Sequence, residues 1–244
     1  MAFAIFDIET RIDKRLLNQT YFEERLDDEV AYQRWRERQL EHNGGDFAPL
    51  PLHLPISIAI GTVDTAYVLR SVDSLGLPSY SEEALTREFW SRAERFDGCL
   101  VTFNGRRFDW PVLELCALRY GIPAASHFEN SPRLCDEARH LDLLDFLTND
   151  GAARLRGGID LLLKMIGMPG KTGIDGSMVQ DYYDAGRLDE IHRYCRADVI
   201  QTYFLFLRVQ LIRGRITVVD YAAARAASES FINEVRALAA EARR

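Results

Sequence analysis

The chain lacks cysteine pairing signals, long apolar runs and an excess of basic over acidic residues. Each absence disfavours one class of protein. Its four cysteines show no C-x-x-C spacing, which disfavours a zinc site or a disulfide framework. No apolar run reaches the ~18 residues of a membrane span. The first residues lack the basic and apolar regions of a signal peptide. We therefore expect a cytoplasmic protein with reduced thiols and no membrane contact.

The charge balance disfavours a protein that coats nucleic acid through a basic surface. The 244 residues include 30 Lys and Arg against 37 Asp and Glu, a formal net charge of −7. Proteins that bind duplex nucleic acid broadly are usually basic. Any nucleic-acid contact must therefore be local or supported by metal ions. The 47% hydrophobic content is that of a globular domain able to bury a large core.

The hydrophobic pattern predicts strands early in the chain and helices that dominate later. Strands are expected at 3–6, 56–63, 66–70 and 99–103. Helices are expected at 18–42, after a Ser81 cap, and at 111–119, 141–148, 159–167, 176–185, 188–212 and 217–242. A Gly- and Pro-rich connector separates the first helix from the second strand. This order is typical of a three-layer α/β fold.

Two acids follow the first predicted strand, in the stretch FAIFDIETR. Asp7 and Glu9 are two residues apart, so a strand places them on the same face. Like charges held together near apolar residues repel, and burial penalises both. Solvated acids at a strand end are the simpler interpretation of this pair alone.

Two further acidic signals occur later in the chain. Asp109 lies between the end of a buried strand and the Pro111 helix, where it could equally be a helix cap. Tyr194 and Asp198 are four residues apart and share one face of the 188–212 helix. If the four acids converge, they form a site for hard divalent cations such as Mg²⁺ or Mn²⁺, which prefer oxygen ligands.

At these residues the chain resembles the DEDD superfamily of 3′–5′ exonucleases. The pattern Asp7-x-Glu9-Thr10 matches the first motif, and Asn104-x-x-x-Phe108-Asp109 resembles that of family-B DNA polymerase proofreading domains. Tyr194-x-x-x-Asp198 matches the tyrosine subclass (DEDDy). The whole is most similar to bacterial proteins predicted to be polymerase-B-like 3′–5′ exonucleases.

The resemblance implies a fold and a set of roles. The fold would be ribonuclease H-like, an α/β three-layer structure with a mixed central sheet flanked by helices. The exonuclease domain would span 1–212 with an insert at about 11–55, and 213–244 would form a helical extension packed on it. Two divalent cations, Mg²⁺ or Mn²⁺, would be held by Asp7, Glu9, Asp109 and Asp198. Tyr194 would position the attacking water, and substrate contacts would come from Thr10, Asn104, Arg106, Phe108 and Lys171.

The implied substrate is the 3′ end of a single strand, DNA ahead of RNA, with nucleoside monophosphates as products. A non-catalytic nucleic-acid-binding module remains the alternative, although such modules usually lose one of the acids. Lys171 lies in PGKTG, which lacks the earlier glycine of a P-loop because Met165 stands there. His140, Asp142 and His53 are expected to be structural. The sequence gives no indication of the oligomeric state.

Overall fold

A five-stranded mixed sheet forms the centre of the molecule in a computed structural model, which describes residues 1–76, 80–129, 139–170, 173 and 175–241. The strands are β1 (Ala2–Ile12), β2 (His53–Val63), β3 (Leu69–Ser74), β4 (Gly98–Thr102) and β5 (His140–Asp142). Their order is β3-β2-β1-β4-β5. The pairs β1–β2 and β2–β3 are antiparallel, whereas β1–β4 and β4–β5 are parallel. The predicted mixed central sheet is confirmed.

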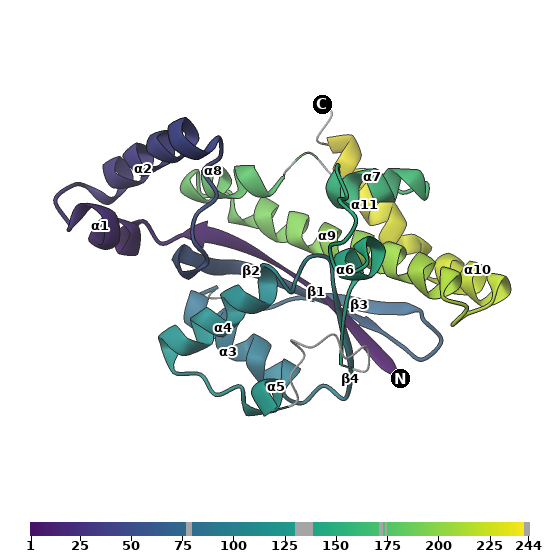
Figure 1. The fold of residues 1–244 in the computed structure, drawn as a ribbon. Coiled ribbons are helices and arrows are strands. Elements are labelled where there is room, and N and C mark those ends of the chain that lie inside the picture. Colours follow the sequence, from purple (N-terminus) through teal and green to yellow (C-terminus); the bar gives the residue numbers. More distant parts are fainter. Residues whose placement is uncertain (77–79, 130–138, 171–172, 174, 242–244) are drawn as a thin grey trace.

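Helices cover both faces of this sheet (Figure 1). One face carries α6 (Leu143–Thr148), α7 (Gly158–Met165), α9 (Leu188–Ile212), α10 (Val218–Ala227) and α11 (Glu229–Glu241). The other face carries α3 (Glu82–Ala93) and α4 (Asp109–Tyr120), with α5 (Ala125–Glu129) beside them. Short elements in the connections between these helices and strands are η1 (Leu50–Leu52), η2 (Gly176–Met178) and α8 (Val179–Asp184). The predicted three-layer arrangement is confirmed.

Alternation along β1 explains how one strand supports two cores. Phe3 and Ile5 pack with α9 in one hydrophobic cluster, whereas Phe6 and Ile8 pack with α3 and α4 in another. Successive strand side chains point to opposite faces, so the odd positions face α9. The same alternation turns Asp7 toward α9.

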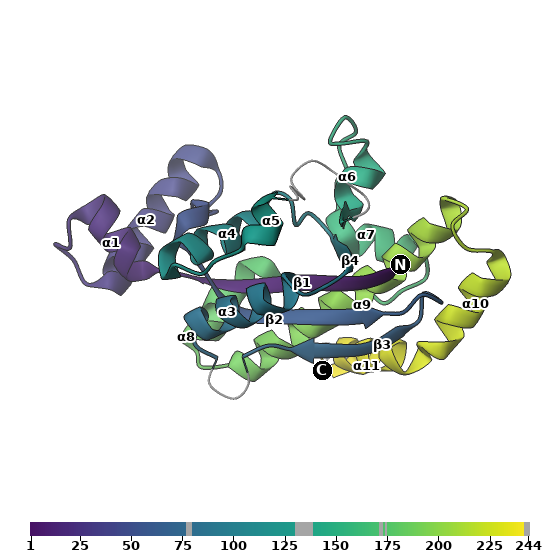
Figure 2. The same cartoon turned by 90° about the horizontal axis from the view of Figure 1, so that it is seen from below.

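A helical arm extends beyond the carboxyl end of β1 (Figure 2). It consists of α1 (Lys14–Phe22) and α2 (Asp28–Asn43), where we expected a single helix over 18–42. The chain breaks because Glu23 and Glu24 take positive φ values, 53° and 55°, and Asp27 then caps α2. Phe22, Leu26 and Val30 recur at helical spacing, but Val30 is 43% exposed because the chain breaks between Phe22 and α2. Trp35, outside this spacing, is buried.

Other element boundaries also differ from the predictions. The strand expected at 66–70 begins later, as β3, because the Asp64 carboxylate accepts the backbone N–H groups of Ala66 and Val68 in a turn. His140–Asp142 forms a strand rather than the start of a helix. The helix expected over 217–242 is divided into α10 and α11 at Ser228. None of the described helices has the length and apolar character needed to cross a bilayer.

Candidate active site

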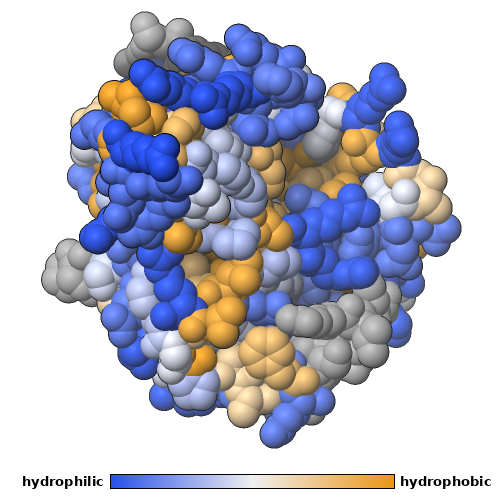
Figure 3. Space-filling view, turned by 60° about the vertical axis from the view of Figure 1, so that its left-hand side comes forward, coloured by the Kyte–Doolittle hydropathy of each residue, from blue (hydrophilic) through white to orange (hydrophobic). Residues whose placement is uncertain are grey.

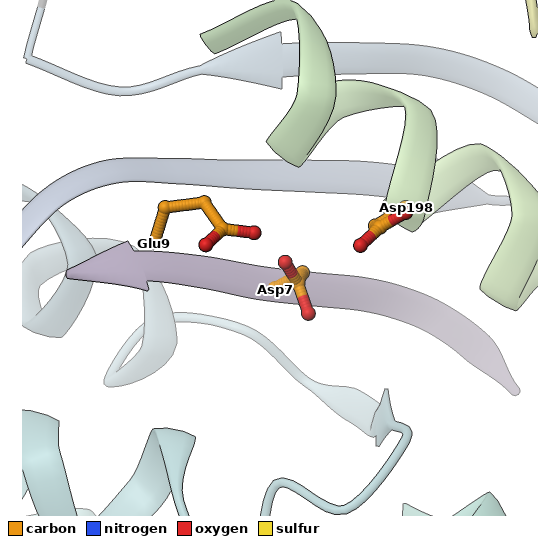
Figure 4. A group of neighbouring side chains, drawn as sticks. All are labelled: Asp7, Glu9 and Asp198. Carbon is orange, nitrogen blue, oxygen red and sulfur yellow. The ribbon is translucent and has the colours of Figure 1, made fainter. Parts of the chain in front are cut away.

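Three carboxylates meet between β1 and α9. Asp7 and Glu9 rise from β1 and Asp198 faces them from α9 (Figure 4). One oxygen from each lies within 4.8 Å of the others. We call these residues the carboxylate triad. A strand of period two and a helix packed across it are sufficient to produce this convergence.

The early end of β4 brings Asp109 to the same region. β4 pairs with residues Ala2 to Ile5 of β1, and the chain leaves the sheet after Thr102. Beyond that point the Asp109 carboxylate accepts the N–H of Ile8 at 3.2 Å, on the edge of β1 that β4 has vacated. Asp109 is the first residue of α4 and is buried. It therefore lies next to the triad but outside its 4.8 Å group.

The electrostatics of these acids follow from burial and crowding. Burial raises the pKa of Asp7 well above its usual range, and the charges of Asp109, Glu9 and Asp198 raise it further. Burial also raises the pKa of Asp109 to about 7, although the N–H donor of Ile8 opposes this shift. The charged site is thus destabilised by its own groups, and a cation among the oxygens would relieve the repulsion.

Tyr194 lies one helical turn before Asp198 on α9. Its side chain is buried and shares a hydrogen bond with the Asp198 side chain. Burial raises the pKa of Tyr194, and the charges of Asp198, Glu9 and Asp7 act in the same direction. The phenol therefore keeps its proton, which it donates to the Asp198 carboxylate. The adjacent Cys195 thiol donates to the backbone carbonyl of Asp7 at 3.4 Å, which fastens α9 to β1.

A cleft of about 870 Å³ opens beside the carboxylates. That volume lies within the ~300–1,000 Å³ of typical small-ligand sites. Asp7 and Glu9 line it from β1 and Asp109 lines it from the start of α4. Tyr32 and Gln180 line it from α2 and α8. Gln180 also accepts the N–H of Ile12 at 2.6 Å, which attaches α8 to β1. The space-filling view from the side of the helical arm shows apolar patches among a mainly hydrophilic surface (Figure 3).

Three of the predicted substrate contacts line this cleft: Thr10, Asn104 and Phe108. The Thr10 hydroxyl lies 2.8 Å from Nδ1 of His53. Asn104 takes a positive φ of 69°, which asparagine tolerates better than most residues, and its N–H donates to Asp142. Their position on the cleft lining agrees with a contact to substrate.

The two other predicted substrate residues differ in outcome. Arg106 is absent from the cleft lining and instead forms ion pairs with Asp145 at 2.7 Å and Asp150 at 3.4 Å. Its neighbour Arg107 lines the cleft. The sequence could not separate these two arginines, because the direction of each side chain depends on the turn after β4. Lys171 lies outside the described residues.

The residues expected to be structural have structural partners. Asp142 accepts the backbone N–H groups of Asn104, Arg106 and Leu144, each at 2.9 Å, and so caps α6 while holding the turn after β4. His140 is bonded to Thr102 and Trp110. Both are buried.

The triad suits a divalent cation on its donor chemistry. It offers three oxygen ligands at short mutual range, and hard cations such as Mg²⁺ select carboxylates over nitrogen or sulfur. The raised pKa of Asp7 shows that the anions are destabilised as they stand. The residues present therefore fit such an ion.

A family comparison agrees with this geometry. Residues 45–241 match the model of a family described as a predicted 3′–5′ exonuclease related to the exonuclease domain of PolB. The chain belongs to this family. It is accordingly a hydrolase of the 3′–5′ exonuclease type. The matched range contains Asp109, Tyr194 and Asp198 and begins after Asp7 and Glu9.

A solved structure shows the same fold at low identity. A family B DNA polymerase from the hyperthermophilic archaeon Pyrobaculum calidifontis is 16% identical, with a TM-score of 0.56 over 86% of this chain. The match covers 24% of the polymerase, so the chain spans about a quarter of that protein. A zinc-bound complex of E. coli ExoI with ssDNA is 15% identical, with a TM-score of 0.42, and the match covers 88% of this chain and 40% of that one. A search of curated proteins gives no match. The predicted ribonuclease H-like fold is confirmed.

Proposed function

We propose that the chain hydrolyses phosphodiester bonds from the 3′ end of single-stranded DNA and releases nucleoside 5′-monophosphates. The carboxylate triad carries the proposal, because three acids from two distant segments converge beside a nucleotide-sized cleft. We favour single-stranded DNA over RNA as the substrate because the Asn104–Asp109 motif resembles that of DNA proofreading domains. The family is also related to the exonuclease domain of PolB.

The roles of the acids follow from their positions. Asp7, Glu9 and Asp198 would hold one Mg²⁺ or Mn²⁺ ion, and Asp7 with Asp109 would hold a second. When bound, such ions supply the charge stabilisation that phosphodiester hydrolysis requires. Asp109 already uses one oxygen on the N–H of Ile8, so its contribution would be limited to the other oxygen or to a bridging water.

Tyr194 would orient the attacking water. Its phenol keeps its proton, because burial and the nearby carboxylates raise its pKa. That proton now bonds the Asp198 carboxylate, and with a cation held by Asp198 the phenol would donate it to the attacking water instead. Thr10, Asn104 and Phe108 would contact the terminal nucleotide from the cleft walls.

The cysteines support a reducing compartment for this activity. Cys116 and Cys195 are buried thiols outside any disulfide. Disulfides are rare in the cytosol, where thiols stay reduced. We therefore propose a cytoplasmic enzyme.

The test is a gel assay with 5′-labelled single-stranded DNA and RNA of one sequence, each with Mg²⁺, Mn²⁺ or chelator. We expect a ladder shortened from the 3′ end that requires metal, is faster on DNA and is absent for Asp7→Ala. Faster shortening of the RNA than of the DNA would indicate that RNA is the preferred substrate. No ladder on either, with unchanged binding of labelled strand, would favour the non-catalytic binding module.

A further inference from the structure

An exposed aromatic residue lines the cleft from the connector between α2 and η1. Phe47 is 71% exposed and borders the same cleft as Asp7, Glu9 and Asp109. Single exposed apolar side chains are common on protein surfaces and need no explanation by themselves. Phe47 differs from such residues in that the chain on both sides of it is anchored.

The connector is anchored on both sides of Phe47. On one side, Asp46 pairs with Arg36 of α2 at 2.7 Å. On the other, the carbonyl of buried Ala48 lies 3.1 Å from Nε2 of His53. The backbone is thus fixed at both neighbours of a side chain that remains in solvent. Such pre-organisation lowers the entropic cost of binding a ligand.

The second anchor continues to the strand that carries the acids. A carbonyl can only accept, so Nε2 of His53 must donate to Ala48 and, in the neutral ring, Nδ1 must accept from the Thr10 hydroxyl. Burial lowers the pKa of His53, which favours that neutral form. Thr10 is the residue after Glu9. Phe47 is therefore positioned relative to the triad through Ala48, His53 and Thr10.

Three rings form one wall of the cleft. The Phe47 and His53 centroids are 5.2 Å apart, His53 and Phe108 are 5.1 Å apart, and Phe47 and Phe108 are 5.9 Å apart. We call Phe47, His53 and Phe108 the aromatic wall. His53 is buried and Phe108 is half-buried, so Phe47 offers the most exposed ring of the three.

We propose that Phe47 stacks on the base of one of the two 3′-terminal nucleotides and thereby selects an unpaired strand. This inference rests on the proposed function. Aromatic platforms bind single strands because every unpaired base has a free face, whereas the faces of duplex bases are already stacked. The contact would tolerate any base sequence, as an enzyme that shortens strands stepwise requires.

The first experiment couples a side-chain change to a base change. Phe47→Ala should raise KM for single-stranded DNA by about 5- to 150-fold, the range expected for one stacked base, with little change in kcat. A substrate that is abasic at the contacted nucleotide should show the same rise with the unaltered protein and no further rise with Phe47→Ala. Phe47→Tyr and Phe47→Trp should keep the contact, and Phe47→Leu should not.

Phe128→Ala is the matched control. Phe128 is 51% exposed on α5 and does not line the cleft, so its loss should leave KM unchanged. An unchanged KM for Phe47→Ala, or an equal loss on abasic and normal strands, would overturn the inference while leaving the ladder of the wild type intact.

A fluorescence readout separates this inference from the enzyme activity. The three native tryptophans, Trp35, Trp90 and Trp110, are buried. In Phe47→Trp, binding of an unlabelled single-stranded oligonucleotide should quench the one exposed tryptophan, and an oligonucleotide abasic at its two 3′ positions should quench it less. Equal quenching by both would contradict stacking, even if the wild type degrades DNA. Base-dependent quenching by a protein that produces no ladder would support the stacking site and contradict the proposed exonuclease activity.

Discussion

Two acids on different strands of the sheet, Asp142 on β5 and Asp7 on β1, have opposite electrostatic environments. Asp142, at the end of β5, accepts three backbone N–H groups, so the chain supplies every donor it uses. Asp7, in β1, faces three other carboxylates, and burial with their charges raises its pKa. The contrast separates a structural acid from one placed for a ligand. Sequence position alone does not separate the two acids, since each directly follows buried apolar residues of its strand.

The strongest test of this contrast removes one member of the triad. Asp7→Asn should lower the hydrolysis rate by more than about 1,000-fold, because the carboxylate that both proposed ions share is lost. Rates measured by the gel ladder at saturating Mg²⁺ check this. A variant that retains most of the wild-type rate would show that the triad is not the reaction centre.

Tyr194→Phe tests the donor beside the triad. Removing the hydroxyl should lower kcat by about 100-fold, at the low end for a group that assists proton movement or orients water, with KM unchanged. Tyr120→Phe is the control and should retain full activity, because Tyr120 lies at the end of α4, near Arg119 and Glu82 rather than the triad. Equal effects of the two changes would exclude a specific role for Tyr194.

Metal should stabilise the fold through the triad. At about 100 times its Kd, a ligand adds about 2.7 kcal/mol, and for a chain of this size each 1 kcal/mol raises Tm by about 2–4 °C. Mg²⁺ should therefore raise Tm by about 5–10 °C in thermal scans. Asp7→Asn should weaken this rise and leave the metal-free protein no less stable, because one repelling charge is gone. A metal-independent Tm in the wild type would contradict the cation site.

Asp142→Ala should show the reverse pattern. It leaves three backbone donors without their acceptor, including the cap of α6, and should cost about 2–3 kcal/mol in the free energy of unfolding. Its rise in Tm with Mg²⁺ should equal that of the wild type. Chemical denaturation with and without Mg²⁺ measures both quantities. Loss of the metal response here would mean that the two groups of acids are not separate.

Local signals in the sequence predicted the layers and much of the site. The long helix was predicted at 188–212, where α9 lies, because its apolar pattern agrees with its burial on the sheet. Ser81 caps the start of α3, as its position predicted. Strand periodicity placed Asp7 and Glu9 on one face, and helix periodicity placed Asp198 on the face of Tyr194. That these acids meet at one site was implied by the resemblance to DEDD exonucleases.

Features that depend on distant contacts were not predictable. The break at Glu23 has no glycine or proline to mark it. Phe47 carries no signal of its own, because its position depends on an ion pair to α2 and a hydrogen bond to β2. Arg106 and Arg107 are adjacent, and only the turn held by Asp142 separates one that pairs with acids from one that lines the cleft.

The length of α9 links catalysis to global unfolding. This 25-residue helix carries Tyr194 and Asp198, and its later residues Tyr203 and Phe206 are fully buried in the main core. Its amides should exchange with solvent only when the whole domain opens. The helical arm has a small separate core around Trp35, so it can open alone. Heating should therefore first disorder the part of the cleft lining that the helical arm supplies, Tyr32 and Arg36. The triad should persist until the domain itself unfolds.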